Sequence, residues 1–294
     1  MAENSGISWT RHTWNPWMGC TKVSPACDGC YAEALMDKRY GKVQWGNAPR
    51  VRTGAHTWND PFRWQRQAER DGDRPFVFCA SLADIFDNQV DPQWRSDAFE
   101  VMRKTPRLVY LLLTKRPQNI IKLASAAGGL PSNAAIGTTI EDQKRADINV
   151  PALIAAKHIV RPEFAFVSCE PLLGPINLRE MILDIEWVIT GGETDQGGHL
   201  ARPTHPEWFH DLRRQCVVSG AAFHHKQNGE WMPWRPLDGN PGNKPIQHVM
   251  ADGSEYYPGN YGSSLQSMIK VGKKVSGREL RGVTYDAFPK VAPL

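Results

Sequence analysis

Short apolar runs recur along the chain, and each ends in a polar or glycine-containing cluster. The runs are rich in Val, Ile, Phe and Leu without a clean alternation of apolar and polar positions, which is typical of strands buried on both faces. They lie at residues 75–84, 107–117, 134–142, 163–171, 185–193 and 221–229. A further short strand is expected around Ile7 to Trp9.

Helical patterns lie between these runs and carry start and stop signals. Asp91 is placed to cap a helix that Pro106 ends. Thr204 and Glu207 have the spacing of a capping box, and Gly220 ends the helix that follows them. Strands that alternate with helices predict a parallel sheet with right-handed crossovers.

The pattern as a whole predicts an α/β fold. Seven βα-like units favour a complete or partial (β/α) barrel over an open sheet. We expect one domain over residues 1–294, with a basic, aromatic insertion at 41–74 after the first helix. Residues 231–294 are expected to form a loop-rich C-terminal extension, because Pro, Gly and Asn are dense at its start.

Composition is that of an ordinary folded protein. Hydrophobic residues make up 41% of the chain and charged residues 22%, which argues against disorder. The opening MAENSGISW lacks the layout of a secretory signal, and no apolar run is long enough to span a membrane. We therefore expect a cytoplasmic protein without a membrane partner, in which clustered cysteines bind metal or act chemically.

The formal net charge of +4 is unevenly distributed. Basic residues are concentrated at 38–70, where Trp and Phe residues lie between them, and again at 270–290. Such a pattern fits contact with a phosphate backbone or with stacked bases. The alternative is a solvated surface with the tryptophans packed beneath it. Nucleic acid is therefore a candidate partner.

Polar side chains follow each of the apolar runs, and burial in the hydrophobic core does not explain polar residues at these positions. The carboxyl ends of the strands in a (β/α) barrel surround a common site, so we expect a shared polar pocket. Its predicted members are Ser81, Asp84, Thr114, Lys115, Arg116, Thr138, Glu141, Ser168, Glu170, Gly191, Gly192, Glu193, Lys226 and Gln227. For Lys115 and Arg116, the alternative is pairing with Asp84 or Glu141 as scaffolding.

Three of the six cysteines lie in the loop that follows the first strand. Cys20, Cys27 and Cys30 are separated by six and then two residues. Each iron of a cubane [4Fe–4S] cluster takes one thiolate, so three cysteines would leave one iron open to another ligand. Zinc is the alternative, because a CxxC pair is also a zinc signature; His12 or a distant cysteine would then be the fourth ligand.

The motifs resemble a bacterial and phage family labelled only "phage protein" or three-cysteine-motif protein, whose function is uncharacterised. The resemblance starts with ISWTRHTWNPWMGCTKVSPACDGCYAE and continues in order through SLADIFD, LLTKRP, CEPLLGPI, GGE, KQNGEW and GRELRGVTYDAFP. It spans nearly the whole chain. That family is similar in turn to radical S-adenosylmethionine (SAM) enzymes, which build a (β/α) barrel around a three-cysteine [4Fe–4S] cluster.

The resemblance implies that the three cysteines hold the cluster and that SAM binds its open iron. In radical SAM enzymes an electron from an external donor cleaves SAM to a 5′-deoxyadenosyl radical, which abstracts hydrogen from the substrate. Two departures stand out. The superfamily usually has three residues between the first two cysteines, where this chain has six. An aromatic residue usually precedes the last cysteine, where this chain has Gly29, and Tyr31 follows it instead.

The resemblance also implies roles for the predicted pocket. The stretch Gly191–Glu193 is similar to the one that grips the SAM amine, although it follows the sixth strand rather than the second. We expect Glu170 or Glu193 near the SAM ammonium, where a carboxylate gains a charge-assisted hydrogen bond. The implied cofactor-binding residues are Tyr31, Ser168, Glu170, Gly191, Gly192 and Glu193. The expected catalytic residues are Lys115, Glu170 and Lys226, and the expected substrate-binding residues are Asp84, Lys115, Arg116, Lys226 and Gln227.

The predicted function is therefore a radical SAM enzyme that modifies or repairs an unknown substrate, with nucleic acid or a nucleotide favoured by the basic residues. A base within a duplex would have to be extruded, and exposed tryptophans could fill the gap. One alternative is a non-catalytic nucleic-acid-binding protein with a zinc or structural iron–sulfur site. Another is an iron–sulfur enzyme that uses the open iron as a Lewis acid without SAM. The sequence indicates neither an oligomeric state nor a partner protein.

Overall fold

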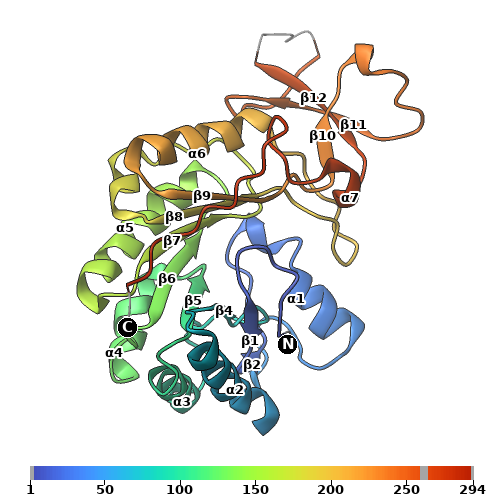
Figure 1. Cartoon of the computed structure of the whole chain (residues 1–294). Helices are drawn as coiled ribbons and strands as arrows, with labels where there is room; N and C mark the ends of the chain where they lie inside the picture. Colours follow the sequence, from blue (N-terminus) through green and yellow to red (C-terminus); the bar gives the residue numbers. More distant parts are fainter. Residues whose placement is uncertain (1–2, 259–263, 293–294) are drawn as a thin grey trace.

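A seven-stranded parallel sheet that curls into a half-barrel dominates the computed structural model, which describes residues 3–258 and 264–292 (Figure 1). The strand order is β1-β4-β5-β6-β7-β8-β9, and all neighbours are parallel. The strands are β1 (His12–Trp14), β4 (Phe76–Cys79), β5 (Val109–Thr114), β6 (Ala134–Thr139), β7 (Ala165–Cys169), β8 (Trp187–Gly191) and β9 (Ala222–Gln227). Because β1 and β9 do not pair, the barrel is partial rather than complete.

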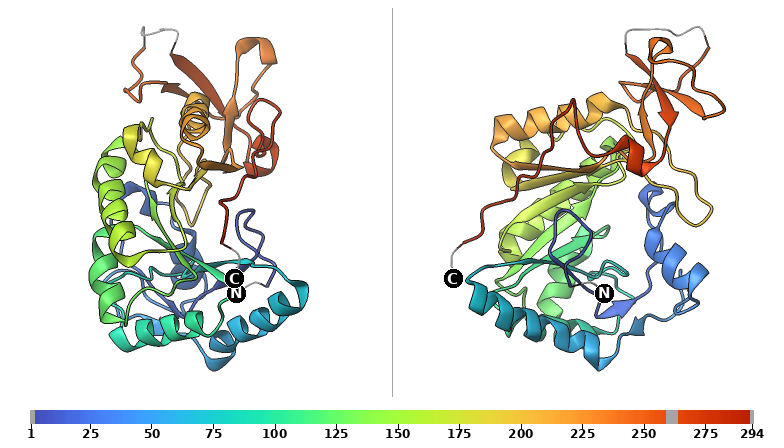
Figure 2. Two further views of the ribbon diagram at one scale, coloured as in Figure 1. Left: turned by 60° about the vertical axis from the view of Figure 1, so that its left-hand side comes forward. Right: turned by 45° about the vertical axis from the view of Figure 1, so that its right-hand side comes forward.

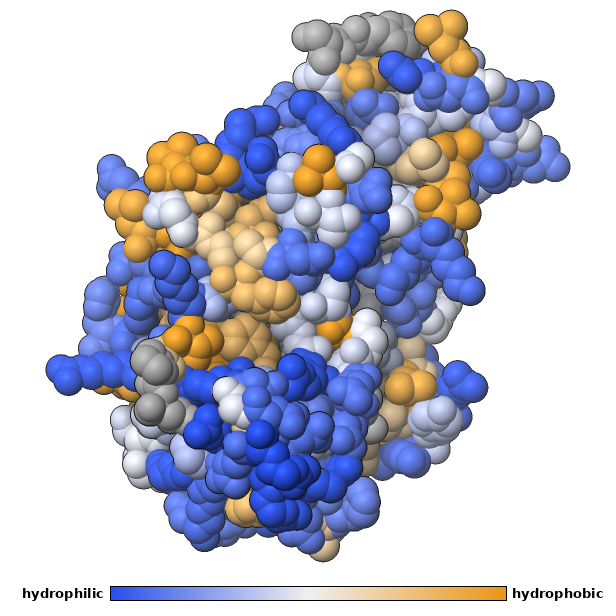
Figure 3. Space-filling model, in the orientation of Figure 1, coloured by the Kyte–Doolittle hydropathy of each residue, from blue (hydrophilic) through white to orange (hydrophobic). Residues whose placement is uncertain are grey.

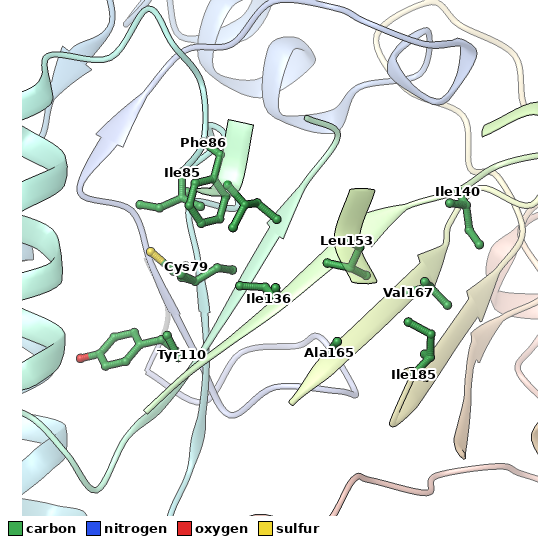
Figure 4. Close-up of a cluster of buried hydrophobic side chains, with 14 of the residues drawn as sticks. Cys79, Ile85, Phe86, Tyr110, Ile136, Ile140, Leu153, Ala165, Val167 and Ile185 are labelled. Atoms are coloured by element: carbon green, nitrogen blue, oxygen red, sulfur yellow. The ribbon is translucent and has the colours of Figure 1, made fainter. Parts of the chain in front are cut away.

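Helical crossovers join these strands and cover the convex side of the sheet (Figure 2). They are α2 (Ala55–Asp71), α3 (Pro92–Arg103), η3 (Pro117–Asn119) with α4 (Ile120–Ala126), α5 (Gln143–Val160), η4 (Arg179–Asp184) and α6 (Pro206–Ser219). The main core lies between sheet and helices, where Tyr110 and Ile136 of neighbouring strands and Leu153 of α5 are fully buried (Figure 4). The predicted alternation of strand and helix is confirmed. None of the helices in the described segments is long and apolar enough to cross a membrane.

The expected first strand around Ile7 to Trp9 was wrong. Ser8 and Trp9 lie in a turn, and the first strand of the sheet begins at His12. Trp9 instead fills the concave side of the half-barrel, where its ring meets Trp187 edge-on at 6.3 Å between centroids. In sequence, this strand looks polar because it begins with His12. The His12 side chain is nevertheless buried, since its ring stacks on Trp64.

The predicted capping was right for α3 and wrong in detail for α6. The Asp91 side chain accepts a hydrogen bond from the Gln93 amide, as an N-cap should. At α6 the N-cap is His205, whose Nδ1 accepts from the Glu207 amide. The hydroxyl of Thr204 is committed elsewhere, since it donates to the Leu172 carbonyl at 2.8 Å.

The expected insertion at 41–74 holds β3 (Val51–Arg52), which pairs with β2 (Trp17–Met18), and the crossover helix α2. Its tryptophans are not exposed: Trp64 is buried, and Trp58 is half-buried against Trp14. None of the eleven tryptophans, all of which are described, is exposed. The expectation that tryptophans are exposed is therefore wrong.

The C-terminal segment from residue 231 contains more than loops. The strands β10 (Trp231–Pro233), β12 (Leu265–Lys270) and β11 (Ile246–Met250) form a small antiparallel sheet in that order, and α7 (Lys273–Ser276) follows. Figure 1 shows this unit as a lobe beside the end of β9. The chain then runs back antiparallel along β9, and the His225 amide donates to the Tyr285 carbonyl. This return covers the outer edge of the sheet.

Candidate functional site

A cavity of about 990 Å³ opens at the carboxyl ends of the parallel strands. Its volume lies at the upper end of the range of roughly 300–1,000 Å³ that ligand pockets occupy. The structure brings nearly all of the predicted cofactor, substrate and metal residues together on its wall. They are Cys20, Cys27, Cys30, Tyr31, Asp84, Lys115, Arg116, Ser168, Glu170, Gly192, Glu193, Lys226 and Gln227. Three residues of the predicted pocket do not line it: Thr138, Glu141 and Gly191.

The three cysteines reach the cavity from one loop, and all three are free thiols. Cys27 ends a short 3-10 helix, η1 (Pro25–Cys27), and Cys30 is the N-cap of α1 (Tyr31–Glu33). The helix continues with π-type pairing as η2 (Ala34–Arg39). The tight 3-10 turn and the helix start direct two thiols of a CxxC pair to the same cavity.

Positive side chains lie beside two of the thiols. Burial raises the pKa of Cys20 to about 11, and Arg116, whose Nη1 is 3.6 Å from the sulfur, opposes this shift. Burial also raises the pKa of Cys30, while the charge of Lys115 acts in the opposite direction. A neighbouring cation favours the thiolate, which is the form that binds metal.

No group of three or more Cys, His, Asp or Glu side chains within residues 3–258 and 264–292 is arranged to hold a single metal ion. Structural zinc needs its ligands about 2.0–2.3 Å from one point. The proposed fourth ligand, His12, is stacked on Trp64 and does not line the cavity. A [4Fe–4S] cluster binds each thiolate at a different iron, so its cysteines need not converge on one point.

Two side chains outside the cysteine motif tie its loop to the barrel. Glu141, fully buried after β6, accepts a hydrogen bond from the Ala26 amide at 3.3 Å. Arg202 donates to the Pro25 carbonyl at 3.0 Å and pairs with Asp28 at 3.2 Å. Charged hydrogen bonds of this kind hold a loop more firmly than neutral ones.

The loop also approaches the opposite wall closely at Gly29. A Cβ at this position would lie 2.7 Å from a ring carbon of His199 and 3.4 Å from an oxygen of Glu193. No side chain fits there without displacing the histidine. The aromatic residue that the superfamily has before its last cysteine is therefore excluded here by packing.

The carboxylate of Glu193 is fully engaged. Both of its oxygens accept hydrogen bonds from Arg202, at distances of 2.6 to 2.9 Å, and the Nε2 of His199 lies 3.1 Å away. Burial acts to raise the pKa of Glu193, but the hydrogen bonds from Arg202 outweigh it and the pKa is lowered. Glu193 therefore fixes Arg202, which holds the cysteine loop, and its oxygens have little capacity left for a ligand.

The carboxylate of Glu170 is only half engaged. Its Oε2 lies 3.3 Å from Nζ of Lys226, whereas its Oε1 is buried and has no hydrogen-bond partner among the described residues. Gly191 makes room for that oxygen, since a Cβ there would lie 2.9 Å from it. Gln227 likewise has a buried side-chain oxygen without a partner in the described chain. Both side chains line the cavity, so a ligand or an ordered water is a candidate donor to these oxygens.

Asp84 and Arg116 form scaffolding, as the alternative held. Asp84 Oδ2 accepts from the Thr114 hydroxyl at 2.9 Å and from Arg116 at 2.8 Å. Arg116 also donates to the Thr21 carbonyl at 2.7 Å, so it connects the end of β5 to the cysteine loop. The Lys115 side chain has no hydrogen bond or ion pair within the described residues.

The remaining predicted residues have smaller parts. The Tyr31 hydroxyl donates to the Ser81 carbonyl at 2.7 Å. Ser168 is buried at the end of β7, and Gly192 lets the chain pass Asn228, whose carbonyl oxygen would lie 2.1 Å from a Cβ. Three residues of the site were missed: His199, Arg202 and Lys273. Only Arg202 had a signal in sequence, as a cation nine residues after Glu193 in the same loop.

A family model described as "Protein of unknown function (DUF5131)" matches residues 4–289. No curated protein matches the chain. Among solved structures, a cysteine-to-serine mutant of spore photoproduct lyase is 13% identical, with a TM-score of 0.45 over 94% of this chain and 72% of that one. A double mutant of the lyase with bound AdoMet and dinucleoside spore photoproduct is 13% identical, with a TM-score of 0.46 over 92% and 71%. Similarity of this degree carries no argument about function.

Proposed function

We propose that this chain, which belongs to the DUF5131 family of proteins of unknown function, is a radical SAM-type enzyme that holds a [4Fe–4S] cluster through Cys20, Cys27 and Cys30. One observation carries the proposal: three free thiols of a single loop line a cavity of about 990 Å³ at the carboxyl ends of a parallel half-barrel. Three thiolates would leave one iron open. When bound, the cluster and SAM supply radical chemistry that starts with one-electron cleavage of SAM.

The surroundings of the thiols fit such a group. Arg116 and Lys115 place positive charge beside two of them, which favours thiolates. The loop that carries them is held from both sides by Glu141 and Arg202. The donors are soft sulfur ligands, which suit an iron–sulfur cluster better than a hard cation.

The residues of the cavity wall have separable tasks in this proposal. The carboxylate of Glu170 would pair with the ammonium group of SAM, and Lys226 holds that carboxylate in place through Oε2. Ser168 and Gly192 line the same side, and Tyr31 lies beside the cysteine loop. Lys115 contacts a substrate that is nucleic acid or a nucleotide, and an external donor supplies the electron.

The floor of the cavity is apolar, which protects a reactive intermediate from water. Trp9, Phe78 and Leu113 line it from the concave side of the half-barrel. The rim above them is polar and charged. A ligand held at the rim would therefore have its reacting part over an apolar surface.

Anaerobic reconstitution tests the proposal. We expect about four irons and four sulfides per chain, and reductant-dependent formation of 5′-deoxyadenosine from SAM. Replacing Cys20, Cys27 or Cys30 by Ala should abolish both. Cys216→Ala is the matched control, because this thiol is buried on α6 away from the cavity and should be dispensable for iron binding.

Three outcomes would overturn the proposal. Colourless protein with one zinc per chain would favour a structural metal site in a binding protein. Iron uptake that survives all three substitutions would remove the cysteines from the site. A cluster whose EPR signal does not change when SAM is added would favour Lewis-acid chemistry at the open iron.

A further inference from the structure

The wall of the cavity carries an excess of positive charge. Its basic residues are Lys22, Lys38, Arg39, Lys115, Arg116, Lys226 and Lys273, and its acidic residues are Asp84, Glu170 and Glu193. Each of these acids is already paired with a cation, namely Asp84 with Arg116, Glu170 with Lys226 and Glu193 with Arg202. The excess therefore rests on the cations that have no such partner.

Three lysines of the wall have no hydrogen bond or ion pair from their side chains within the described residues. These rim lysines are Lys38 in η2, Lys115 after β5 and Lys273 at the start of α7. They come from segments far apart in sequence, and α7 belongs to the C-terminal lobe (Figure 1). The acids of the wall do not neutralise these three ammonium groups, so they give the cavity a positive potential that attracts an anion.

Lys273 shows this excess most directly. Its pKa is lowered by partial burial and by the charge of Lys226, while the charges of Glu170 and Glu230 act in the opposite direction. Glu230, below the start of α7, accepts from the Lys273 amide rather than from its ammonium group. The Lys273 ammonium therefore has neither a hydrogen bond nor an ion pair within residues 3–258 and 264–292, and it is available to a ligand.

The apolar floor limits what kind of anion fits. Ile7, Trp9, Phe78 and Leu113 line the cavity beneath the charged rim. A simple inorganic anion makes no favourable contact with an apolar surface. A nucleotide fits both parts of the cavity, because its planar base can pack on the apolar side chains and its phosphate can pair with the lysines.

We infer that the rim lysines Lys38, Lys115 and Lys273 bind the phosphate of a nucleotide, either free or within a single strand of nucleic acid. The inference rests on the proposed function only in taking this cavity to be the active site. It gives the C-terminal lobe a task, because Lys273 is the lobe's contribution to the cavity wall. Arg116, one of the expected substrate-binding residues, is paired with Asp84 and is not part of this phosphate site.

Direct binding to the reconstituted full-length chain tests the site in the absence of SAM. The probes are nucleoside 5′-monophosphates with each common base, the matching nucleosides, and mixed-sequence single-stranded DNA and RNA, titrated by calorimetry at two salt concentrations. Lys273→Gln and Lys38→Gln should each weaken binding of the phosphorylated probes about tenfold. Lys274→Gln is the matched control, since this exposed neighbour does not line the cavity and its loss should change nothing.

Lys115 is not used as the principal test, because it also acts on the Cys30 thiol. Binding that is tighter for a monophosphate than for its nucleoside and depends on Lys273 supports the site. A strand that binds more tightly than the monophosphate identifies nucleic acid as the source of the phosphate, and equal binding identifies a free nucleotide. Absence of binding by any phosphorylated probe, or equal losses for Lys273→Gln and Lys274→Gln, overturns the inference.

These results are independent of the proposed chemistry. Formation of 5′-deoxyadenosine without phosphate-dependent binding would leave the radical SAM proposal standing and remove the phosphate site. Lys273-dependent binding by a chain that never cleaves SAM would do the reverse.

Discussion

One oxygen of Glu170 faces Lys226 at 3.3 Å, and the other is buried without a hydrogen-bond partner in the described chain. Glu193, the other carboxylate expected near the SAM ammonium, is occupied by Arg202 through both oxygens. The two acids thus differ in the number of carboxylate oxygens that can still accept a hydrogen bond. Among the described acids that line the cavity, Glu170 alone has an oxygen without a hydrogen-bond partner.

Replacing Glu170 by Gln should therefore weaken SAM binding while leaving the cluster intact. The amide keeps the shape of the side chain but loses the charge that pairs with the ammonium group, and we expect affinity for SAM to fall about tenfold. Equilibrium dialysis of SAM against the reconstituted variant measures this, with iron content recorded in parallel.

Glu100→Gln is the control for Glu170→Gln, because Glu100 is exposed on α3, pairs with Arg103 and Lys104, and does not line the cavity. An unchanged SAM affinity in Glu170→Gln would remove Glu170 from the cofactor site. A loss of iron in that variant would instead make the residue a structural support of the loop.

Arg202 should be needed for retention of the cluster rather than for its chemistry. Its guanidinium joins Glu193 on one side to the Pro25 carbonyl and Asp28 on the other, so it fixes the cysteine loop against the barrel. Arg202→Gln removes the charged hydrogen bonds and should speed the loss of iron to a chelator several-fold. Timed chelation followed by absorbance of the cluster measures this.

The control for Arg202 is Arg235→Gln, whose exposed side chain pairs only with Asp238 on the C-terminal lobe. The far-UV circular dichroism of both variants should match that of the parent chain. Equal rates of iron loss in the parent and in Arg202→Gln would contradict the assigned role.

Strands of the sheet were predictable where hydrophobicity alone buries them. Val109–Thr114 forms a strand inside the apolar run at 107–117. His12–Trp14 was missed because His12 is buried by the ring of Trp64, a contact that no local pattern indicates. Because Ile7 and Trp9 are apolar, the first strand was predicted at these residues. Trp9 instead lies in a turn, and its side chain fills the concave face of the sheet.

The site was predictable to the extent that parallel strands bring their carboxyl ends together. Ser168 and Lys226 lie far apart in the chain yet line one cavity for that reason. The state of each side chain was not predictable, because it depends on partners from other elements. Arg202 donates hydrogen bonds to Glu193, whereas one oxygen of Glu170 has no donor among the described residues. Arg202 lies in a loop without a sequence motif, so this difference could not be predicted.

The contact between Gly29 and His199 yields a test by substitution and rescue. Gly29→Ala places a Cβ 2.7 Å from the histidine ring, so the loop or the ring must move. Overpacking of this kind costs roughly 1–3 kcal/mol, and it should lower iron retention as well as stability. Chemical denaturation and iron analysis of the variant measure the two effects.

His199→Ala supplies the rescue for Gly29→Ala. The double variant should recover most of the lost stability, because the small side chain leaves space for the new Cβ. Strictly additive losses in the double variant would show that the two residues do not constrain each other.

The pH dependence of stability should follow three buried histidines. Burial lowers the pKa of His12, His224 and His225 to about 4 in the folded protein, whereas in the unfolded chain each titrates near the ordinary value of 6.5. Between these values the unfolded chain binds more protons, so stability must rise with pH. It is fully present above pH 6.5 and is lost as the pH falls toward 4, by at most about 1.4 kcal/mol per pH unit for each histidine.

Urea denaturation of the metal-free chain at several pH values between 7 and 4.5 measures this slope. The three cavity thiols do not interfere, because their ordinary pKa lies well above this range and burial raises that of Cys20 and Cys30 further. His56→Ala provides the comparison, since this side chain is 91% exposed and its removal should leave the slope unchanged. A stability that stays flat or increases toward pH 4.5 would contradict this prediction. It would mean that the histidines bind protons in the folded protein as readily as in the unfolded chain.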